Sequence, residues 1–327
     1  MMDRFCLYAK DHVLSFVNQR VGEEKLGEKV RTISSLEDIP TVEAKFVLLG
    51  IPEDIGVRAN YGIGGCKTAW ESTLKALLNI QSNSFLIGEE ILVLGHFDIE
   101  EPEDQSVIGL RKKTAQIDSL VYPVIEKIVR AGKIPIVVGG GHNNAFPIIA
   151  GLHLGNGRQK VNVVNIDAHA DLRLPTEGRH SGNGFSNALG SGFLAEYRIF
   201  GLHQNYVHQS LPGYLAAHQN MKALYFEEIL LSDKSIIEHW NLFIETLPKP
   251  CGLEVDLDSI AQVLSSATTP SGFALNDLRK LLLTNRKEFS YLHICEGAVQ
   301  LSDGRTAPTT GKTIAYLISD FVKGYPI

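Results

Sequence analysis

Cysteine is scarce in this chain, and its few cysteines are not spaced as a disulfide framework or a metal site requires. Cys6, Cys66, Cys251 and Cys295 form no Cys-x-x-Cys pair, which argues against both possibilities. Long apolar runs are also lacking, since no stretch reaches the roughly eighteen residues of a membrane span. The first residues contain no uninterrupted apolar stretch of signal-peptide length. We therefore expect a cytoplasmic protein with reduced thiols that does not span a membrane.

An excess of positive charge is lacking as well. The net charge is −6, which leaves no basic surface for nucleic acid or anionic lipid. Hydrophobic residues make up 44% and charged residues 21% of the 327 positions, as in ordinary globular proteins. These numbers favour a small-molecule partner over nucleic acid or a membrane.

Short apolar runs alternate with helical patterns along the whole chain. Several of these runs are apolar on both faces, which is typical of parallel strands covered by helices. The pattern predicts an α/β fold with three α/β/α layers around a mainly parallel eight-stranded sheet. We expect one domain over residues 1–327, with residues 1–35 as a peripheral arm. The predicted strands are 46–51, 91–95, 134–140, 161–166, 198–202, 223–227, 251–257 and 290–295.

Two helices are well marked by their apolar spacing. One runs through residues 117–128 and ends at Gly132, a residue suited to a helix terminus. Pro123 lies inside it, so we expect a kink or a later start there. The other has its apolar face over residues 314–322 and closes at Gly324.

Polar clusters follow directly on three predicted strands. Three glycines precede His142, "NIDAHADLR" supplies Asp167, His169 and Asp171, and "GLEVDLDSI" supplies Asp256 and Asp258. Alternate residues of an extended chain share a face, so members of each cluster can point the same way. In parallel sheets, sites form at the carboxyl ends of the strands. We therefore expect these side chains to converge there.

Four carboxylates and two imidazoles in one place require cations. Two divalent ions would balance the four aspartates, and a carboxylate-rich set suits Mn²⁺ better than zinc. Each motif alone is weak, because Asp-x-His-x-Asp can be a surface turn and "GGGH" lacks the Lys-Ser/Thr of a phosphate loop. Their occurrence after strands of one sheet favours a two-metal site that activates water for hydrolysis.

These motifs identify a resemblance to the ureohydrolase family, which includes arginase, agmatinase and formimidoylglutamase. The chain resembles it from "VLLGIPEDIGVRANYGIGG" (47–65) to "LHICEGA" (292–298), with GGGH, DAHAD and DLD in the family's order. The resemblance implies the family's parallel eight-stranded α/β/α fold, two Mn²⁺ ions per subunit and hydrolysis of a C–N bond at an amidine or guanidine carbon. It also implies a homo-oligomer.

By the same resemblance, each motif residue acquires a role. Asp171 would shuttle a proton to the leaving nitrogen, in addition to binding metal, and Glu296 would accept a hydrogen bond from a ligand histidine. Asp277 would pair with the cationic end of the substrate, although it could instead belong to the first turn of a helix. One ion would be held by His142, Asp167, Asp171 and Asp256, and the other by His169, Asp167, Asp256 and Asp258.

The stretch "DLRLPTEGRHSGNGFSNAL" (171–189) is most similar to formimidoylglutamases. Arg173 would bind a substrate carboxylate through its planar fork, and Ser181 and Asn183 resemble the arginase loop that grips an amino acid. Arg58 and Asn60 would face a distal carboxylate, or else shape a loop. Formimidoyl-glutamate has two carboxylates and agmatine has none, so we expect a formimidoylglutamase of histidine degradation.

Other functions remain open at this stage. Phe185 stands where arginases have a proton-shuttling histidine, which counts against arginase, and Glu254 stands where relatives often have a small residue. His293 is expected to be a core histidine with a backbone partner. The alternatives are an agmatinase or another guanidino-acid ureohydrolase, a non-catalytic metal-binding relative and, less favoured, a single-zinc deacetylase of similar architecture.

Overall fold

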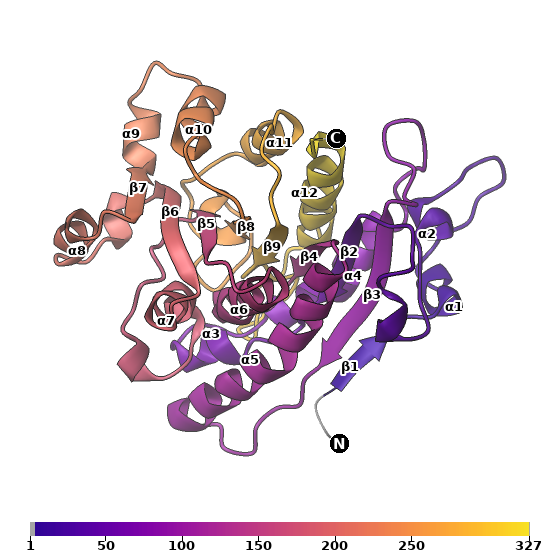
Figure 1. Ribbon diagram of the computed structural model, residues 1–327, viewed down its shortest axis with the longest axis horizontal. Coiled ribbons are helices and arrows are strands. Elements are labelled where there is room, and N and C mark those ends of the chain that lie inside the picture. The colour runs from indigo at the N-terminus through magenta and orange to yellow at the C-terminus, as the bar shows by residue number, and fades with distance from the viewer. Residues whose placement is uncertain (1–3, 327) are drawn as a thin grey trace.

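The computed structural model describes residues 4–326. A nine-stranded sheet forms its centre, in the order β1-β3-β2-β4-β9-β8-β5-β6-β7 (Figure 1). β1 pairs antiparallel with β3, and the other pairings are parallel. The strands are β1 (Arg4–Leu7), β2 (Phe46–Gly50), β3 (Ile91–Asp98), β4 (Ile134–Val138), β5 (Val161–Ile166), β6 (Leu194–Leu202), β7 (Met221–Tyr225), β8 (Cys251–Asp256) and β9 (Tyr291–Cys295).

The predicted α/β fold is confirmed, and each predicted run overlaps one of β2 to β9, although β3, β6 and β7 extend beyond the predicted bounds. The predicted number of eight strands is wrong by one, because β1 adds an antiparallel edge strand. This strand has only four residues, and none of them is buried, so its sequence carries no strong strand pattern. It lies within the segment expected to be a peripheral arm, and Val13 and Leu26 of that segment are fully buried.

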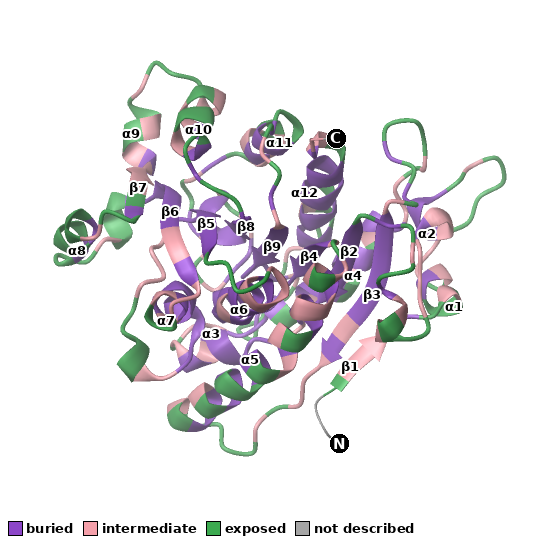
Figure 2. Cartoon of the chain, in the orientation of Figure 1, coloured by how far each residue is buried: buried purple, intermediate pink, exposed green. Residues whose placement is uncertain are grey.

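Helices cover both faces of the sheet, and their inward sides are buried (Figure 2). One apolar cluster joins β-strand side chains to α4, α10, α11 and α12, and a second joins the opposite face to α3, α5, α6 and α7. The three-layer arrangement is therefore as predicted. The helices are α1 (Lys10–Leu14), α2 (Leu26–Lys29), α3 (Ile55–Ala59), α4 (Ala69–Leu77), α5 (Val107–Arg130), α6 (Ala145–Gly155), α7 (Gly184–Gly190), α8 (Leu211–Ala217), α9 (Phe226–Leu230), α10 (Ile236–Ile244), α11 (Leu275–Leu283) and α12 (Thr310–Gly324).

The long helix α5 begins earlier than expected and continues through Pro123. Ser106 caps its first turn by accepting a hydrogen bond from the Gly109 amide. Proline leaves the carbonyl four residues before it without an intrahelical donor, and that residue, Ser119, is exposed to water. The cost of the missing bond is therefore small. The helix ends before Gly132, which has a φ of 70°, as the sequence predicts.

No helix among residues 4–326 is both long enough and apolar enough to cross a membrane.

The strands β4, β9, β8 and β5 are consecutive neighbours in the sheet. Because these strands are parallel, their carboxyl ends lie along one edge. The polar clusters predicted from the sequence follow β4, β5 and β8, so the sheet brings them to this edge.

Candidate metal centre

The loop after β4 turns sharply to place His142 against the end of the sheet. Gly139 and Gly140 have φ values of 87° and 74°, a region that favours glycine. A Cβ on Gly141 would lie 2.6 Å from the Asn143 Oδ1 atom. The loop therefore requires all three glycines, two for backbone conformation and one for close approach. His142 itself is fully buried.

The loop after β5 supplies Asp167, His169 and Asp171, but not in the geometry expected from alternation. The strand ends at Ile166, and Asp171 has a φ of 49°. The Asp167 Oδ1 atom accepts the His169 amide at 2.6 Å, which folds the segment into a turn. The side chains therefore converge because the backbone turns, and the interpretation of this segment as extended chain is wrong.

β8 ends at Asp256, and a short 3₁₀ helix over Leu257–Ser259 carries Asp258. The Asp256 Oδ1 atom accepts the Asp258 amide at 2.9 Å. This bond caps the short helix and fixes both carboxylates at the strand end. Both residues are buried, with 2% and 4% of their surface exposed.

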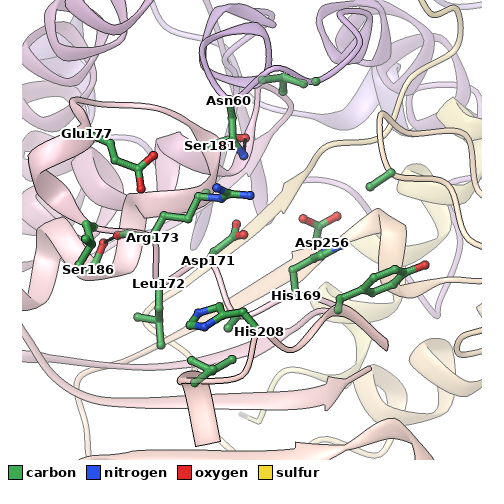
Figure 3. A pocket seen from close by; sticks show the side chains of 18 of the residues that line it. Asn60, His169, Asp171, Leu172, Arg173, Glu177, Ser181, Ser186, His208 and Asp256 are labelled. Atoms are coloured by element: carbon green, nitrogen blue, oxygen red, sulfur yellow. Dashed lines mark hydrogen bonds between the residues drawn. The ribbon is translucent and has the colours of Figure 1, made fainter. Parts of the chain in front are cut away.

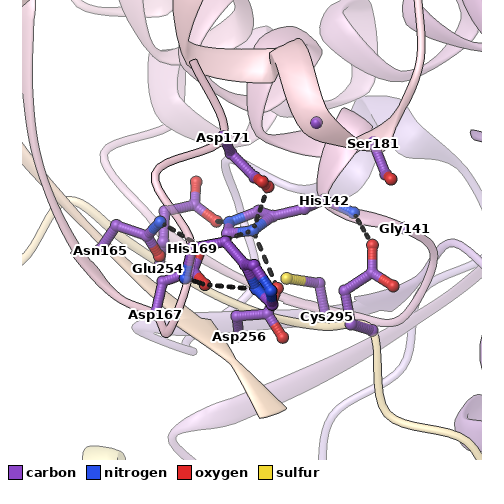
Figure 4. A network of polar contacts seen from close by, with 12 residues as sticks. Gly141, His142, Asn165, Asp167, His169, Asp171, Ser181, Glu254, Asp256 and Cys295 are labelled. Carbon is purple, nitrogen blue, oxygen red and sulfur yellow. Dashed lines mark hydrogen bonds and ion pairs between the residues drawn. The ribbon is translucent and has the colours of Figure 1, made fainter. Parts of the chain in front are cut away.

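The six predicted ligands meet in two overlapping groups, of which Figure 4 labels His142, Asp167, His169, Asp171 and Asp256. The His142 Nδ1 atom lies 3.0 Å from Asp171, 3.1 Å from Asp256 and 3.3 Å from Asp167 carboxylate oxygens. The His169 Nδ1 atom lies 3.1 Å from Asp258 and 3.6 Å from Asp167. Asp167 belongs to both groups, whereas Asp256 belongs to the first only.

The protonation of the cluster reflects crowded charge in a buried place. Burial raises the pKa of Asp258 to about 6, and burial with the neighbouring Asp258 and Asp167 raises the pKa of Asp256 well above its usual range. Although burial would lower it, Asp258 and Asp167 raise the pKa of His169 to about 12. The cluster therefore holds protons that divalent cations would replace.

The residues present fit a pair of divalent cations. The Asp258 Oδ1 atom is buried without a hydrogen-bond partner among residues 4–326, which is costly unless something else satisfies it. The donor set of four carboxylates and two imidazoles offers mainly hard oxygen ligands, as Mn²⁺ prefers. Cys295 lies near His142 in a further group with His293, but burial raises the pKa of its thiol well above the usual value.

A cavity of about 870 Å³ opens above the cluster (Figure 3). Its lining includes eight of the predicted site residues, namely Asn60, His169, Asp171, Arg173, Ser181, Asp256, Asp258 and Glu296. Leu172, Leu174, Tyr206 and Tyr214 add apolar surface. The cavity size lies in the usual range for small-molecule sites. The cluster therefore borders a space that a substrate can enter.

Arg173 is the cation of this cavity. Its guanidinium reaches towards Ser181 above Asp171 (Figure 3), and no carboxylate among residues 4–326 pairs with it. The Arg173 amide donates to the Gly182 carbonyl at 2.9 Å, and a Cβ on Gly182 would lie 3.0 Å from the Arg173 Cδ atom. Gly182 therefore leaves the room that this side chain occupies.

Arg58 and Asn183 lie near the cavity but do not line it. The Arg58 guanidinium binds Asp54 at 2.9 Å and Glu101 at 2.5 Å, so its charge is already compensated. Of the two interpretations of Arg58, loop shaping matches these contacts. The Asn183 side chain donates to the Gly178 carbonyl and accepts from Arg179, so it holds its own loop and is not free to grip a substrate.

Asp277 belongs to neither of the two ligand groups and does not line the cavity. It occupies the first turn of α11, where its Oδ2 atom accepts the Ala274 amide at 3.1 Å. Negative charge at this position stabilises a helix N-terminus. The expectation that Asp277 meets the substrate is therefore corrected in favour of the helix-capping interpretation.

Glu296 is the acidic residue that the sequence interpretation undervalued. Its Oε1 atom accepts the backbone amide of His142 at 2.8 Å, rather than the imidazole, and the side chain lines the cavity. Its φ of 63° turns the chain at the end of β9. The signal in the sequence was its place directly after a strand. Tyr206, His208 and Ser186 also line the cavity, and no motif marked them.

The surroundings of His293 differ from the sequence expectation. His293 is fully buried as expected, but its Nδ1 atom meets the Glu254 carboxylate at 2.6 Å, and the Gly139 carbonyl lies farther away at 3.5 Å. His180 is buried with its Nδ1 atom accepting the Gly182 amide. Phe185 is fully buried and packs edge-on against His142.

Comparison with known proteins agrees with this geometry. A formimidoylglutamase from Salmonella heidelberg (strain SL476) is 32% identical over 132 residues, which are 40% of this chain and 38% of that protein. The crystal structure of formimidoylglutamase from Bacillus subtilis superposes with a TM-score of 0.75 at 17% identity over 95% of both chains. Trypanosoma cruzi formiminoglutamase with Mn²⁺ gives 0.71 at 20% identity, over 92% of this chain and 98% of that one.

The chain matches the Salmonella formimidoylglutamase over well under half of that protein's length. The two solved structures share the fold of this chain. The model of the Arginase family matches residues 44–318, which include the three ligand motifs, Arg173 and Glu296. This match extends over most of the chain. The protein belongs to the arginase family.

Proposed function

We propose that this protein is a binuclear manganese hydrolase that converts N-formimidoyl-L-glutamate and water to L-glutamate and formamide. Water is added at the amidine carbon, and the bond from this carbon to the glutamate nitrogen breaks. Hydrolysis of amidine C–N bonds is supported by membership of the Arginase family and by the formimidoylglutamase relatives.

The two ions would be held by the two groups that share Asp167. One group is His142, Asp167, Asp171 and Asp256, and the other is His169, Asp167 and Asp258, with Asp256 adjacent to the second. Ions bound there would supply Lewis-acid polarisation and a water-derived nucleophile near neutral pH. The structural neighbour from Trypanosoma cruzi, a formiminoglutamase solved with Mn²⁺, supports the choice of metal.

Arg173 is the residue that favours formimidoyl-glutamate as the substrate. Arg173 has no anionic partner in the described part of the chain, and its planar fork matches a carboxylate. Asn60 and Ser181 lie on the same wall of the cavity and hydrogen-bond each other at 3.3 Å. Together they form a polar wall for the carboxylates of the substrate. Agmatine, which carries no carboxylate, would bring only positive charge to Arg173.

Asp171 and Glu296 would handle protons and the amidine group. The Asp171 side chain is 15% exposed and borders both His142 and the cavity, so it can pass a proton to the leaving nitrogen. Burial raises the pKa of Asp171, which helps it hold that proton. Glu296 uses Oε1 to hold the His142 amide, and its other oxygen can accept an amidine N–H.

A substrate panel tests this function. Protein loaded with Mn²⁺ is assayed for formamide with N-formimidoyl-L-glutamate and for urea with agmatine, arginine and guanidinobutyrate. We expect formamide and no urea. Urea from agmatine without formamide would make the protein an agmatinase, and two bound Mn²⁺ ions without turnover of any substrate would make it a non-catalytic relative.

A further inference from the structure

Glu254 is a buried carboxylate behind the proposed metal centre that the mechanism above does not use. Glu254 and Asp256 are two residues apart on β8, so they point to the same face of the sheet. Asp256 lies 3.1 Å from the His142 Nδ1 atom, and Glu254 lies 3.6 Å from the His142 Nε2 atom. One strand therefore presents a carboxylate to each nitrogen of the same ring (Figure 4).

The Nε2 atom of His142 has no hydrogen-bond partner among residues 4–326, although it is buried. A histidine that binds a metal through Nδ1 carries its proton on Nε2, and this N–H group requires an acceptor. The Glu254 Oε2 atom is the carboxylate oxygen that faces it. The 3.6 Å separation exceeds a normal hydrogen bond.

The surroundings of Glu254 fix its position. The Tyr291 hydroxyl donates to Oε1 at 2.6 Å, and His293 meets Oε2 at 2.6 Å. Glu254 and His293 are direct cross-strand partners of β8 and β9. Gly252 leaves room for the Tyr291 ring, because a Cβ there would lie 2.1 Å from the Tyr291 Cε1 atom. A carboxylate held this firmly can orient the ring that it contacts.

We propose that Glu254 is a positioning residue of the metal centre, which accepts the Nε2–H of His142 and thereby keeps the Nδ1 lone pair directed at the ion. The proposal rests on the metal binding of the proposed function, but not on the identity of the substrate. If Glu254 had only a structural role, it would contact Tyr291 and His293 alone. Its substitution would then lower the stability of the protein without weakening the binding of one ion in particular.

The test is a titration of Mn²⁺ alone into chelator-treated protein, in which binding is measured by calorimetry. The wild-type protein should bind two equivalents; a failure here would refute the metal centre itself. Glu254→Gln keeps the shape and removes the charge, and partners of this kind are worth about 10- to 100-fold in metal affinity. We expect one of the two dissociation constants to rise by that factor and the other to stay within about threefold.

Asp320→Asn is the matched control. Asp320 is also buried and ion-paired, with Arg279 at 2.6 Å on α11, and it contacts no predicted ligand, so both of its constants should match the wild type. If Glu254→Gln folds poorly, Glu254→Asp replaces it in the test. This variant keeps the charge but withdraws it by one methylene, and it should weaken the same single site. Wild-type constants in the Glu254 variants, or an equal loss at both sites, would overturn the proposal.

Discussion

Arg179 links the loop that contains Asn183 to the loop that contains Asn143, next to His142. Its substitution should therefore lower the stability of the protein. Its guanidinium donates to Asp118 of α5 at 2.7 and 3.2 Å, to the Asn183 side chain at 2.7 Å and to the Asn143 carbonyl at 2.7 Å. Asp118 and Arg179 are 6% and 8% exposed. The substitution Arg179→Met would therefore leave a buried carboxylate without its partner.

Breaking a buried ion pair on one side costs about 3–5 kcal/mol. For a chain of this length, that corresponds to a fall in Tm of about 4–7 °C. The double variant Arg179→Met/Asp118→Leu removes both charges and should recover most of the loss, because an apolar pair often replaces a buried ion pair without cost. The assay is thermal unfolding by calorimetry at several pH values.

The loss in Arg179→Met should depend on pH with a defined sign. Burial raises the pKa of Asp118 to about 6 even with Arg179 nearby, and removing the cation raises it further. A carboxyl with a folded pKa above its unfolded value binds its proton more tightly when folded, so stability falls as pH rises through that window. The loss should be small near pH 5 and full near pH 8. A loss independent of pH, or no recovery in the double variant, would refute the reasoning.

Further predictions concern the cavity and the ions. Arg173→Met should lower kcat/KM for formimidoyl-glutamate by about 10- to 150-fold, which is the contribution of hydrogen bonds to a charged group. The control variant Lys160→Met removes an exposed cation and should leave kcat/KM unchanged. Equal kinetics in the two variants would contradict the carboxylate site. Gly182→Ala should raise KM with Tm nearly constant, because its Cβ would meet Asn60 at 2.9 Å and displace Arg173; an unchanged KM would show that this packing is unimportant. Mn²⁺ affinity should fall as pH drops through about 6, where Asp258 takes up a proton, and a flat titration from pH 8 to 5 would contradict that competition.

The sequence by itself determined the elements that carry the site. Apolar runs marked β2 to β9, and the polar residues at or after the carboxyl ends of β4, β5 and β8 include all six predicted ligands. Both signals are local, because hydrophobic burial and the position of a residue after a strand are encoded by adjacent residues. Arg173 and Ser181, which the resemblance of residues 171–189 to known hydrolases marked as substrate-binding residues, both line the cavity.

Only the tertiary structure decided which acids face the ions and the substrate. Asp277 and Glu296 are both acidic residues of the C-terminal third, yet one caps α11 and the other lines the cavity. Glu254 was marked only as a departure from relatives, and its relation to His142 comes from the order β4-β9-β8 in the sheet. These outcomes depend on contacts between residues far apart in the chain, and the spacing of residues along one strand or loop does not encode such contacts.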